Sequence, residues 1–332
     1  MKRTGALRVL GLWISPMGDR AEGALIASDG TDFELLQSEV LELAEPERVA
    51  LGIGGQKAAQ VAEDCAAQLF ERFEGVELVG FQGPVLRFER GITLEAAGNG
   101  DVLAEAFGVP VAWNFLAEDF RLGGASLLMN QAALASAVGA SSKVLVVSLD
   151  TRIQATWVEN GVVALAQETG PGLGLMSVMP SVSGGRVAEA LPEMLVDEPF
   201  FSRMGPRLVS GQMTDRIALM LSELAPADAY ATALAMIVAG LLQTIEDGPF
   251  EPKKIYISGP GSEMADLREI LGAVFERIEG VSIPANAAQA AGVGLMAVRL
   301  VRKKTLSGPT ISGVPAAIAS GQISGDIQAG AR

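Results

Sequence analysis

The same order of predicted elements occurs twice along this chain, and this repeat limits the possible folds more than any other feature of the sequence. Near the amino terminus, β-rich runs separated by short turns occupy residues 6–14, 22–30 and 32–43. An alanine-rich amphipathic stretch at 56–73 then predicts a helix. The pattern begins again with an apolar strand at 143–150, followed by a hairpin around Asn160 and Gly161 and then by helices.

A chain with two such repeats is expected to form two α/β domains with a cleft between them. We predict a duplicated actin-like (ribonuclease H-like) fold, because that architecture begins each domain with three successive strands. The predicted domains are residues 1–140 and 141–305, and the Ser-, Gly- and Ala-rich tail at 306–332 is predicted to be loop. A single doubly wound sheet is the alternative. It explains the alternation of strands and helices but not the repeated hairpins.

Charge and histidine content exclude several classes of function. The chain of 332 residues has 25 Lys and Arg against 39 Asp and Glu, a net charge of −14, so no nucleic-acid or membrane partner is expected. It contains no histidine, which removes Ser-His-Asp and Cys-His nucleophile systems and histidine-bound zinc. No metal site is predicted. Acid–base chemistry therefore falls to carboxylates, Lys, Tyr or Cys65.

Cysteine usage and the amino terminus favour a cytoplasmic location. The single cysteine, Cys65, cannot form a disulfide within the chain, which fits a reducing compartment. The first residues resemble the start of a signal peptide, but Arg8 interrupts the apolar run and the segment is interpreted as a strand. The uncharged run at 229–245 is at the lower limit for a membrane span, and a buried helix is the preferred interpretation.

Several short blocks of sequence carry a resemblance to a known family. In chain order they are GLWISPMGDRAEGALI (11–26), VGFQGPVLRF (79–88), WNFLAEDFRLGG (113–124), ETGPGLGLM (168–176), ISGPGSEMADL (257–267) and GPTISG (308–313). Their order and spacing are similar to those of the anhydro-N-acetylmuramic acid kinase family. The resemblance covers nearly the whole chain and implies a duplicated actin-like fold, dimers and a link to peptidoglycan recycling. Members of that family open the 1,6-anhydro ring of their sugar with water and phosphorylate it, using ATP and Mg²⁺.

The resemblance also implies nucleotide-binding positions and a general base. Glu168 stands where the family has its base. Pro16 and Met17 replace residues that offer donors to phosphate. Asp150 and Thr151 replace paired glycines, which puts a carboxylate where phosphates would approach. The residues that correspond to nucleotide-binding positions are Ser15, Asp19, Gly170, Gly172, Gly259, Gly261 and Ser262.

On the sugar side, the resemblance implies Asn114, Asp119 and Gln289 as binding residues. Two nearby positions depart from the family pattern. Gln82 stands in place of a histidine, and Leu116 stands in place of an arginine suited to a sugar carboxylate. The polar positions have thus changed, whereas the pattern of strands and helices persists.

These losses predict a catalytically degenerate relative, a pseudokinase that acts by binding. Its expected partners are an amino sugar or muropeptide, a second copy of itself, or an unidentified protein. The alternative is an active, divergent ATP-dependent kinase that hydrolyses and phosphorylates 1,6-anhydro-N-acetylmuramic acid with Glu168 as its base. ATP and Mg²⁺ are expected only in the second case. Self-association through the helix at 229–245 is expected in the first.

Overall fold

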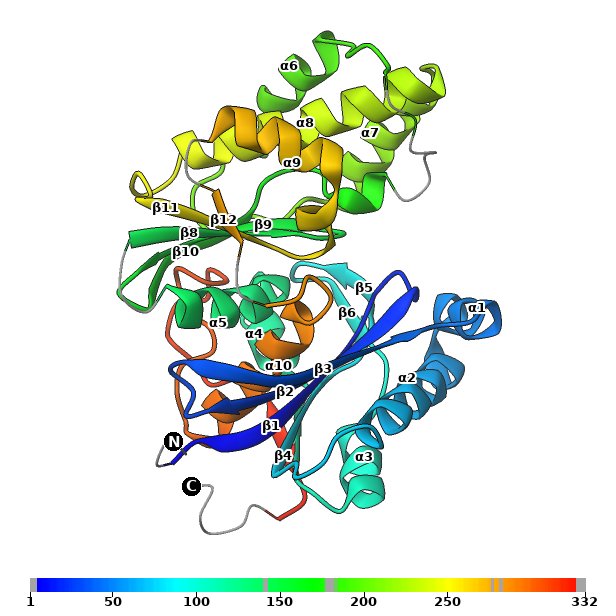
Figure 1. The fold of residues 1–332 in the computed structure, drawn as a ribbon, viewed down its shortest axis with the longest axis vertical. Helices are drawn as coiled ribbons and strands as arrows, with labels where there is room; N and C mark the ends of the chain where they lie inside the picture. The colour runs from blue at the N-terminus through cyan, green and yellow to red at the C-terminus, as the bar shows by residue number, and fades with distance from the viewer. Residues whose placement is uncertain are drawn as a thin grey trace. The chain divides into compact units, whose positions relative to one another are not determined.

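The computed structural model describes residues 5–139, 143–176, 182, 184–275, 278–280 and 283–326. Contacts within the chain divide it into two compact units, each of which is a sheet with helices packed on it (Figure 1). Unit 1 consists of Met1–Val138 and Asn286–Arg332, and unit 2 is Gly139–Ala285.

The unit 1 sheet has its strands in the order β13-β7-β4-β1-β2-β3. Strands β1, β2 and β3 form an antiparallel meander, and β4 and β7 continue the sheet parallel to β1 on its other side. Strand β13 pairs antiparallel with β7 at the edge. The strands are Leu7–Ile14 (β1), Arg20–Ser28 (β2), Phe33–Glu42 (β3), Leu78–Gln82 (β4), Val111–Trp113 (β7) and Gln322–Ser324 (β13).

Helices cover both faces of the unit 1 sheet (Figure 1). On one face, alanines of α2 pack with Leu10 and Leu12 of β1. On the other face, α10 approaches so closely that a Cβ at Gly11 would lie 1.8 Å from the Ala290 carbonyl oxygen. The helices are Glu45–Ile53 (α1), Gly55–Phe70 (α2), Gly100–Phe107 (α3), Phe115–Arg121 (α4), Met129–Val138 (α5) and Ala288–Val301 (α10), and a separate hairpin joins Val85–Glu89 (β5) to Thr93–Ala96 (β6).

The unit 2 sheet has the order β10-β9-β8-β11-β12. Strands β8, β9 and β10 form an antiparallel meander, and β11 and β12 follow β8 in parallel. In both units the first strand is therefore central, with the meander on one side and parallel strands on the other. This shared topology confirms the predicted duplicated actin-like fold. The strands are Lys143–Leu149 (β8), Ile153–Glu159 (β9), Val162–Glu168 (β10), Lys254–Ser258 (β11) and Ile278–Gly280 (β12).

The predicted helix at 229–245 is the centre of the unit 2 helical layer. In the described part of the chain, α8 is the one helix long and apolar enough to span a membrane, but 61% of its apolar window is buried. It packs against α6, α7 and α9 (Figure 1). These contacts are those of a core helix. The four helices are Ala190–Val196 (α6), Gly211–Ser222 (α7), Pro226–Glu246 (α8) and Ala265–Val274 (α9).

The last helix packs in unit 1, which differs from the predicted domain at 141–305. Helix α10 contacts β1, β2, β4 and α5. A Cβ at Gly80 would lie 2.7 Å from the Val293 carbonyl oxygen, so small residues of the sheet set this close approach. The chain leaves unit 1 after Val138, close to the predicted boundary at 140, and returns at Asn286.

The tail also differs from the predicted loop at 306–332. Its described part, which ends at Asp326, includes β13 and an antiparallel bridge between Ser307 and Ile318. Trp113 Nε1 donates to Ser324 Oγ at 2.9 Å. The tail therefore completes one edge of unit 1.

The lone cysteine belongs to the unit 1 core. Cys65 is fully buried on α2, among the alanines that face the sheet. Burial, with a smaller contribution from nearby carboxylates, raises the pKa of its thiol to about 12. A thiol that is neutral at physiological pH suits a packing role rather than nucleophilic chemistry.

Candidate functional site

Two charged side chains meet at the open end of the β9–β10 hairpin in unit 2. Glu168 ends β10 and lies opposite Gln154, so Arg152 just before β9 is its diagonal neighbour. Arg152 Nε and Nη2 both donate to the Glu168 carboxylate, Nη2 at 2.7 Å. The Val209 N–H donates to Glu168 Oε2 at 2.6 Å, and Arg152 Nη2 also donates to the Val209 carbonyl oxygen at 2.9 Å. The three residues form a closed charged cluster.

The carboxylate side of this cluster is shielded from solvent. The Glu168 side chain is 1% exposed, whereas that of Arg152 is 39% exposed. Burial alone would lower the pKa of the Arg152 guanidinium, but the Glu168 carboxylate raises it overall, so the guanidinium stays charged. A general base needs a lone pair within reach of the proton that it removes. Here the Glu168 oxygens already accept three hydrogen bonds.

The loop after β8 is held by hydrogen bonds to its own aspartate and to the turn after Glu168. Asp150 is 5% exposed, and its Oδ1 accepts from the Thr151 N–H at 2.7 Å. The Leu173 N–H donates to the Asp150 carbonyl oxygen at 3.0 Å, and the Gly174 N–H to that of Thr151 at 3.1 Å. A Cβ at Gly172 would lie 2.1 Å from the Thr151 carbonyl oxygen. The loop after β8 and the turn after Glu168 are thus in direct backbone contact.

The glycine turn after β11 reaches the same end of the unit 2 sheet. A Cβ at Gly259 would lie 2.8 Å from the Leu149 carbonyl oxygen, and one at Gly261 would lie 2.7 Å from the Leu149 Cβ. The Ser262 hydroxyl donates to the Gly259 carbonyl oxygen at 2.7 Å. The structure therefore brings one set of predicted residues together at the carboxyl ends of the unit 2 strands, namely Glu168, Gly170, Gly172, Gly259, Gly261 and Ser262.

The turn between β1 and β2 in unit 1 closes on itself. The Ser15 N–H donates to the Arg20 carbonyl oxygen at 3.0 Å, and the Gly18 N–H donates to that of Ser15 at 2.9 Å. The Met17 N–H donates to Ser15 Oγ at 3.2 Å, and Arg20 Nη1 donates to Asp19 Oδ2 at 3.0 Å. Burial would raise the pKa of Asp19, but the Ser15 hydroxyl and the Arg20 guanidinium lower it overall. Ser15 and Asp19 thus lie in the same turn, and their hydrogen-bond partners belong to that turn.

A cavity of about 220 Å³ lies in unit 1 beyond the carboxyl ends of two parallel strands. Gln82 ends β4 and Trp113 ends β7, and both line the cavity with Asn114. Asn114 has a φ of 53°, and its side chain makes no hydrogen bond that caps α4. Such a position beyond parallel strands is where α/β proteins bind small ligands.

The other two predicted sugar-binding residues have partners elsewhere in unit 1. Asp119 is fully buried, and its carboxylate accepts from Ser126 Oγ at 2.7 Å, from Ser312 Oγ at 2.6 Å and from the Ser307 hydroxyl. Gln289 Oε1 accepts from Asn130 Nδ2 at 2.7 Å. Of the three, Asn114 is therefore the one that the structure places at the cavity.

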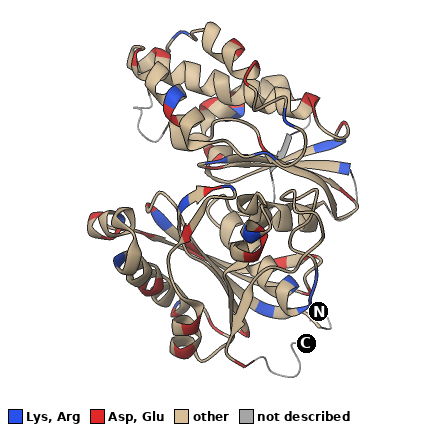
Figure 2. Cartoon of the chain, turned by 180° about the vertical axis from the view of Figure 1, so that it is seen from behind, with Lys and Arg blue, Asp and Glu red and all other residues tan. Residues whose placement is uncertain are grey.

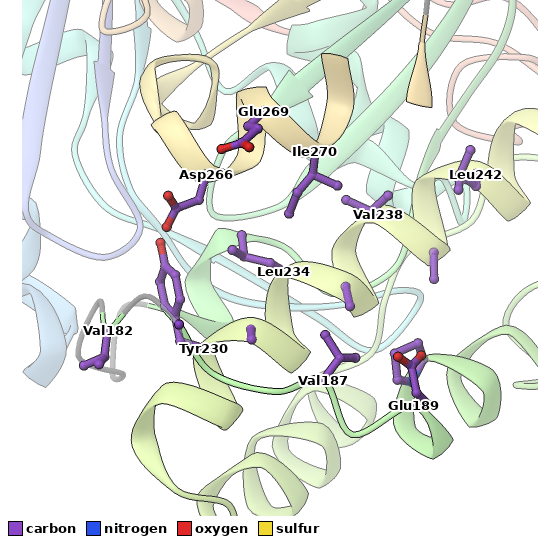
Figure 3. A pocket seen from close by; sticks show the side chains of 15 residues that line it. Val182, Val187, Glu189, Tyr230, Leu234, Val238, Leu242, Asp266, Glu269 and Ile270 are labelled. Carbon is purple, nitrogen blue, oxygen red and sulfur yellow. The ribbon is translucent and has the colours of Figure 1, made fainter. Parts of the chain in front are cut away.

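A second concavity, in unit 2, is an apolar groove of about 650 Å³ between α8 and α9 (Figure 3). Leu234 and Val238 of α8 and Ile270 of α9 form part of its floor, and Asp266 and Glu269 lie at its α9 side. No described lining residue is Lys or Arg. The groove therefore suits an uncharged or cationic group better than a phosphate.

Charged side chains are interspersed along the helices and strands of each unit (Figure 2). Within the described residues, no group of three or more His, Cys, Asp or Glu side chains is arranged to hold a metal ion.

Two arginines have contacts that were not predicted from the sequence. Arg152 is the partner of Glu168, a pairing that the symmetry of the hairpin around Asn160 could have indicated. Arg207 is 4% exposed, and burial lowers the pKa of its guanidinium. It donates to the Phe201 carbonyl oxygen at 2.8 Å and to Thr244 Oγ1 at 3.1 Å. No local sequence signal identifies those contacts, because they depend on tertiary packing.

No family model matches the sequence. Curated proteins are nevertheless similar to the chain over nearly its whole length. The chain is 28% identical over 363 residues to the anhydro-N-acetylmuramic acid kinase of Ruegeria sp. (strain TM1040), which covers 97% of this chain and 96% of that protein. It is 29% identical over 362 residues to the protein of the same name from Cereibacter sphaeroides, with 98% of each covered. These relatives confirm the resemblance predicted from the sequence blocks.

Solved structures were matched at lower similarity. A ROK family glucokinase from Streptomyces griseus, in complex with glucose and AMPPNP, has a TM-score of 0.44 and 14% sequence identity. The match covers 87% of this chain and 99% of that one.

Proposed function

We propose that this relative of the anhydro-N-acetylmuramic acid kinases binds an amino sugar linked to peptidoglycan recycling and has lost phosphoryl transfer. The observation that carries the proposal is the ion pair between Arg152 and Glu168. Glu168 stands at the position of the family's base, and Arg152 pairs with its carboxylate. The Glu168 side chain is 1% exposed. With the base paired and buried, the first step of the relatives' reaction lacks its proton acceptor.

The phosphate-binding positions fit a triphosphate poorly. The Thr151 N–H donates to the Asp150 carboxylate, and this buried carboxylate would repel a phosphate. In unit 1, Pro16 has no N–H, and the N–H groups of Met17 and Gly18 donate to Ser15. We therefore derive no step through ATP and Mg²⁺, which are needed only if the protein is active.

An active kinase is the second candidate function. The intact segment Thr169–Gly170–Pro171–Gly172 favours it, because this turn directly follows the carboxylate that resembles the family's base. In that case Arg152 would have to release Glu168 before the carboxylate could accept a proton. Such a kinase would hydrolyse and phosphorylate 1,6-anhydro-N-acetylmuramic acid with ATP.

The release of ADP separates the two candidates. We expect the purified protein, incubated with 1,6-anhydro-N-acetylmuramic acid, ATP and Mg²⁺, to release ADP no faster than without the sugar. Calorimetric titration with Mg-ATP is expected to show no binding. Sugar-dependent turnover that disappears in Glu168→Gln, with the variant still folded by circular dichroism, would sink the proposal and establish the active kinase.

We also propose that the protein acts in the cytoplasm, as its single cysteine indicates, and as a homodimer, as the family resemblance implies. A protein that works by binding needs a stable contact surface, and the exposed edge of α8, with Leu242 39% exposed, is one apolar candidate. Sedimentation equilibrium at micromolar concentration is expected to give twice the chain mass. A strict monomer would remove the homodimer and leave an unidentified protein partner.

A further inference from the structure

We infer that the unit 1 cavity binds a single neutral sugar ring and discriminates against the carboxylate of muramic acid. This inference rests on the proposed function and narrows it to one class of amino sugar. The cavity is the one lined by Gln82, Trp113 and Asn114.

The size of the cavity limits its ligand to about one ring. Its volume of about 220 Å³ is below the range of roughly 300–1,000 Å³ that is common for drug-sized ligands. A muropeptide, with its peptide stem, exceeds that space. Among peptidoglycan fragments, a single sugar ring with an acetamido group is the largest that fits a cavity of this volume.

Gln82 and Asn114 bring side-chain amides to the lining of the cavity. Gln82 is 8% exposed, and its Nε2 donates to the Gly83 carbonyl oxygen at 3.0 Å, which sets the orientation of the amide. Its Oε1 is buried and accepts no hydrogen bond from the described residues. Because this oxygen has almost no accessible surface, the amide that a ligand in the cavity can meet is that of Asn114, whose side chain makes no hydrogen bond that caps α4.

The walls of the cavity suit the apolar face of a sugar ring. The Trp113 indole is held in place because its Nε1 donates to Ser324 at 2.9 Å and because a Cβ at Gly100 would lie 2.2 Å from its ring. Phe81 and Leu94 line other parts of the wall. A rigid aromatic surface beside an amide is a combination that orients a neutral, hydroxyl-bearing ring.

The absence of charge around the cavity is what excludes a carboxylate. None of the described residues that line it is Lys, Arg, Asp or Glu, and Leu116 and Ala117 stand on the α4 side. A carboxylate moved from water into such surroundings loses hydration and gains no counter-charge. The net charge of −14 adds a weak, general repulsion.

A matched pair of sugars tests this inference without nucleotide. 1,6-Anhydro-N-acetylglucosamine and 1,6-anhydro-N-acetylmuramic acid differ only in the lactyl ether that carries the carboxylate. In calorimetric titrations of the full chain, we expect the neutral sugar to bind at least about tenfold more tightly. Equal affinity, or tighter binding of the acid, overturns the neutral specificity but leaves the proposed binding function intact.

Variants on both sides of the cavity connect the preference to these residues. Asn114→Gly removes the cavity amide at a φ of 53° that glycine adopts freely, and it is expected to weaken binding of the neutral sugar by about tenfold. Gln60→Ala, which removes an exposed amide on α2, leaves it unchanged. Ala117→Arg is expected to reverse the preference, and Ala106→Arg, an added charge on exposed α3, is not. If neither sugar binds wild-type protein at millimolar concentration, the cavity inference fails, and the ADP assay still decides whether phosphoryl transfer is lost.

Discussion

Replacing Arg152 with Met is expected to lower the free energy of unfolding by about 3 kcal/mol, because it leaves the buried Glu168 carboxylate without its counter-ion. Two charge-assisted hydrogen bonds disappear, and among the described residues only the Val209 N–H continues to donate to that carboxylate. Because Arg152 is 39% exposed, we expect a loss at the lower end of the range for buried pairs. Urea unfolding followed by circular dichroism measures it.

A surface ion pair in the same unit supplies the control. Arg216 pairs with Glu198, and their side chains are 47% and 16% exposed. Arg216→Met is therefore expected to cost less than about 1 kcal/mol. If Arg152→Met also costs less than about 1 kcal/mol, the Arg152–Glu168 pair does not stabilise the fold, and the carboxylate is not committed to it.

The strands were predictable because their signals are local. The predicted run at 6–14 corresponds to β1 at Leu7–Ile14, and the run at 143–150 to β8 at Lys143–Leu149. Turn residues mark the ends of these runs, and apolar β-branched residues fill them. The repeat of the meander then identifies the fold class, because few architectures begin two domains in the same way.

The unit to which α10 belongs was not predictable from its own sequence. Its residues are apolar on nearly all sides, so its pattern indicates a buried helix but not the sheet that buries it. That choice depends on Gly11 and Gly80, which allow the helix backbone to approach β1 and β4. A glycine within a strand indicates close approach without identifying the partner.

The candidate site shows the same division between local and tertiary information. The family resemblance identifies Glu168 by its position before the TGPG turn, but the occupation of its oxygens depends on Arg152 across the hairpin and on Val209 farther along the chain. Likewise, Gln82 and Trp113 come together because β4 and β7 are parallel neighbours. The sequence thus identifies the candidate residues. Whether their side chains are free to react depends on tertiary contacts, which the sequence does not show.

Asp119→Ala is expected to destabilise unit 1 by about 3 kcal/mol and to release the tail. Its buried carboxylate accepts from Ser126 of unit 1 and from Ser307 and Ser312 of the tail, and hydrogen bonds to charged groups are worth about 1.5–3 kcal/mol each. Removing the carboxylate takes an acceptor from three buried hydroxyls, and only the contact between Ser307 Oγ and Ser312 Oγ at 2.5 Å remains to two of them among the described residues. Urea unfolding measures the loss, and limited proteolysis of the native protein reports whether the chain after Leu306 becomes accessible.

The neighbouring carboxylate provides the matched control. Glu118 lies one residue earlier on α4, 47% exposed, and pairs only with Arg121 among the described residues, so Glu118→Ala is expected to change stability by less than about 1 kcal/mol. Ser312→Ala, which removes one donor, should fall between the two. If Asp119→Ala keeps wild-type stability and a protected tail, the serines do not need this carboxylate. It would then be free for the sugar-binding role that the family resemblance implies, and the cavity at Gln82 would not be the whole ligand site.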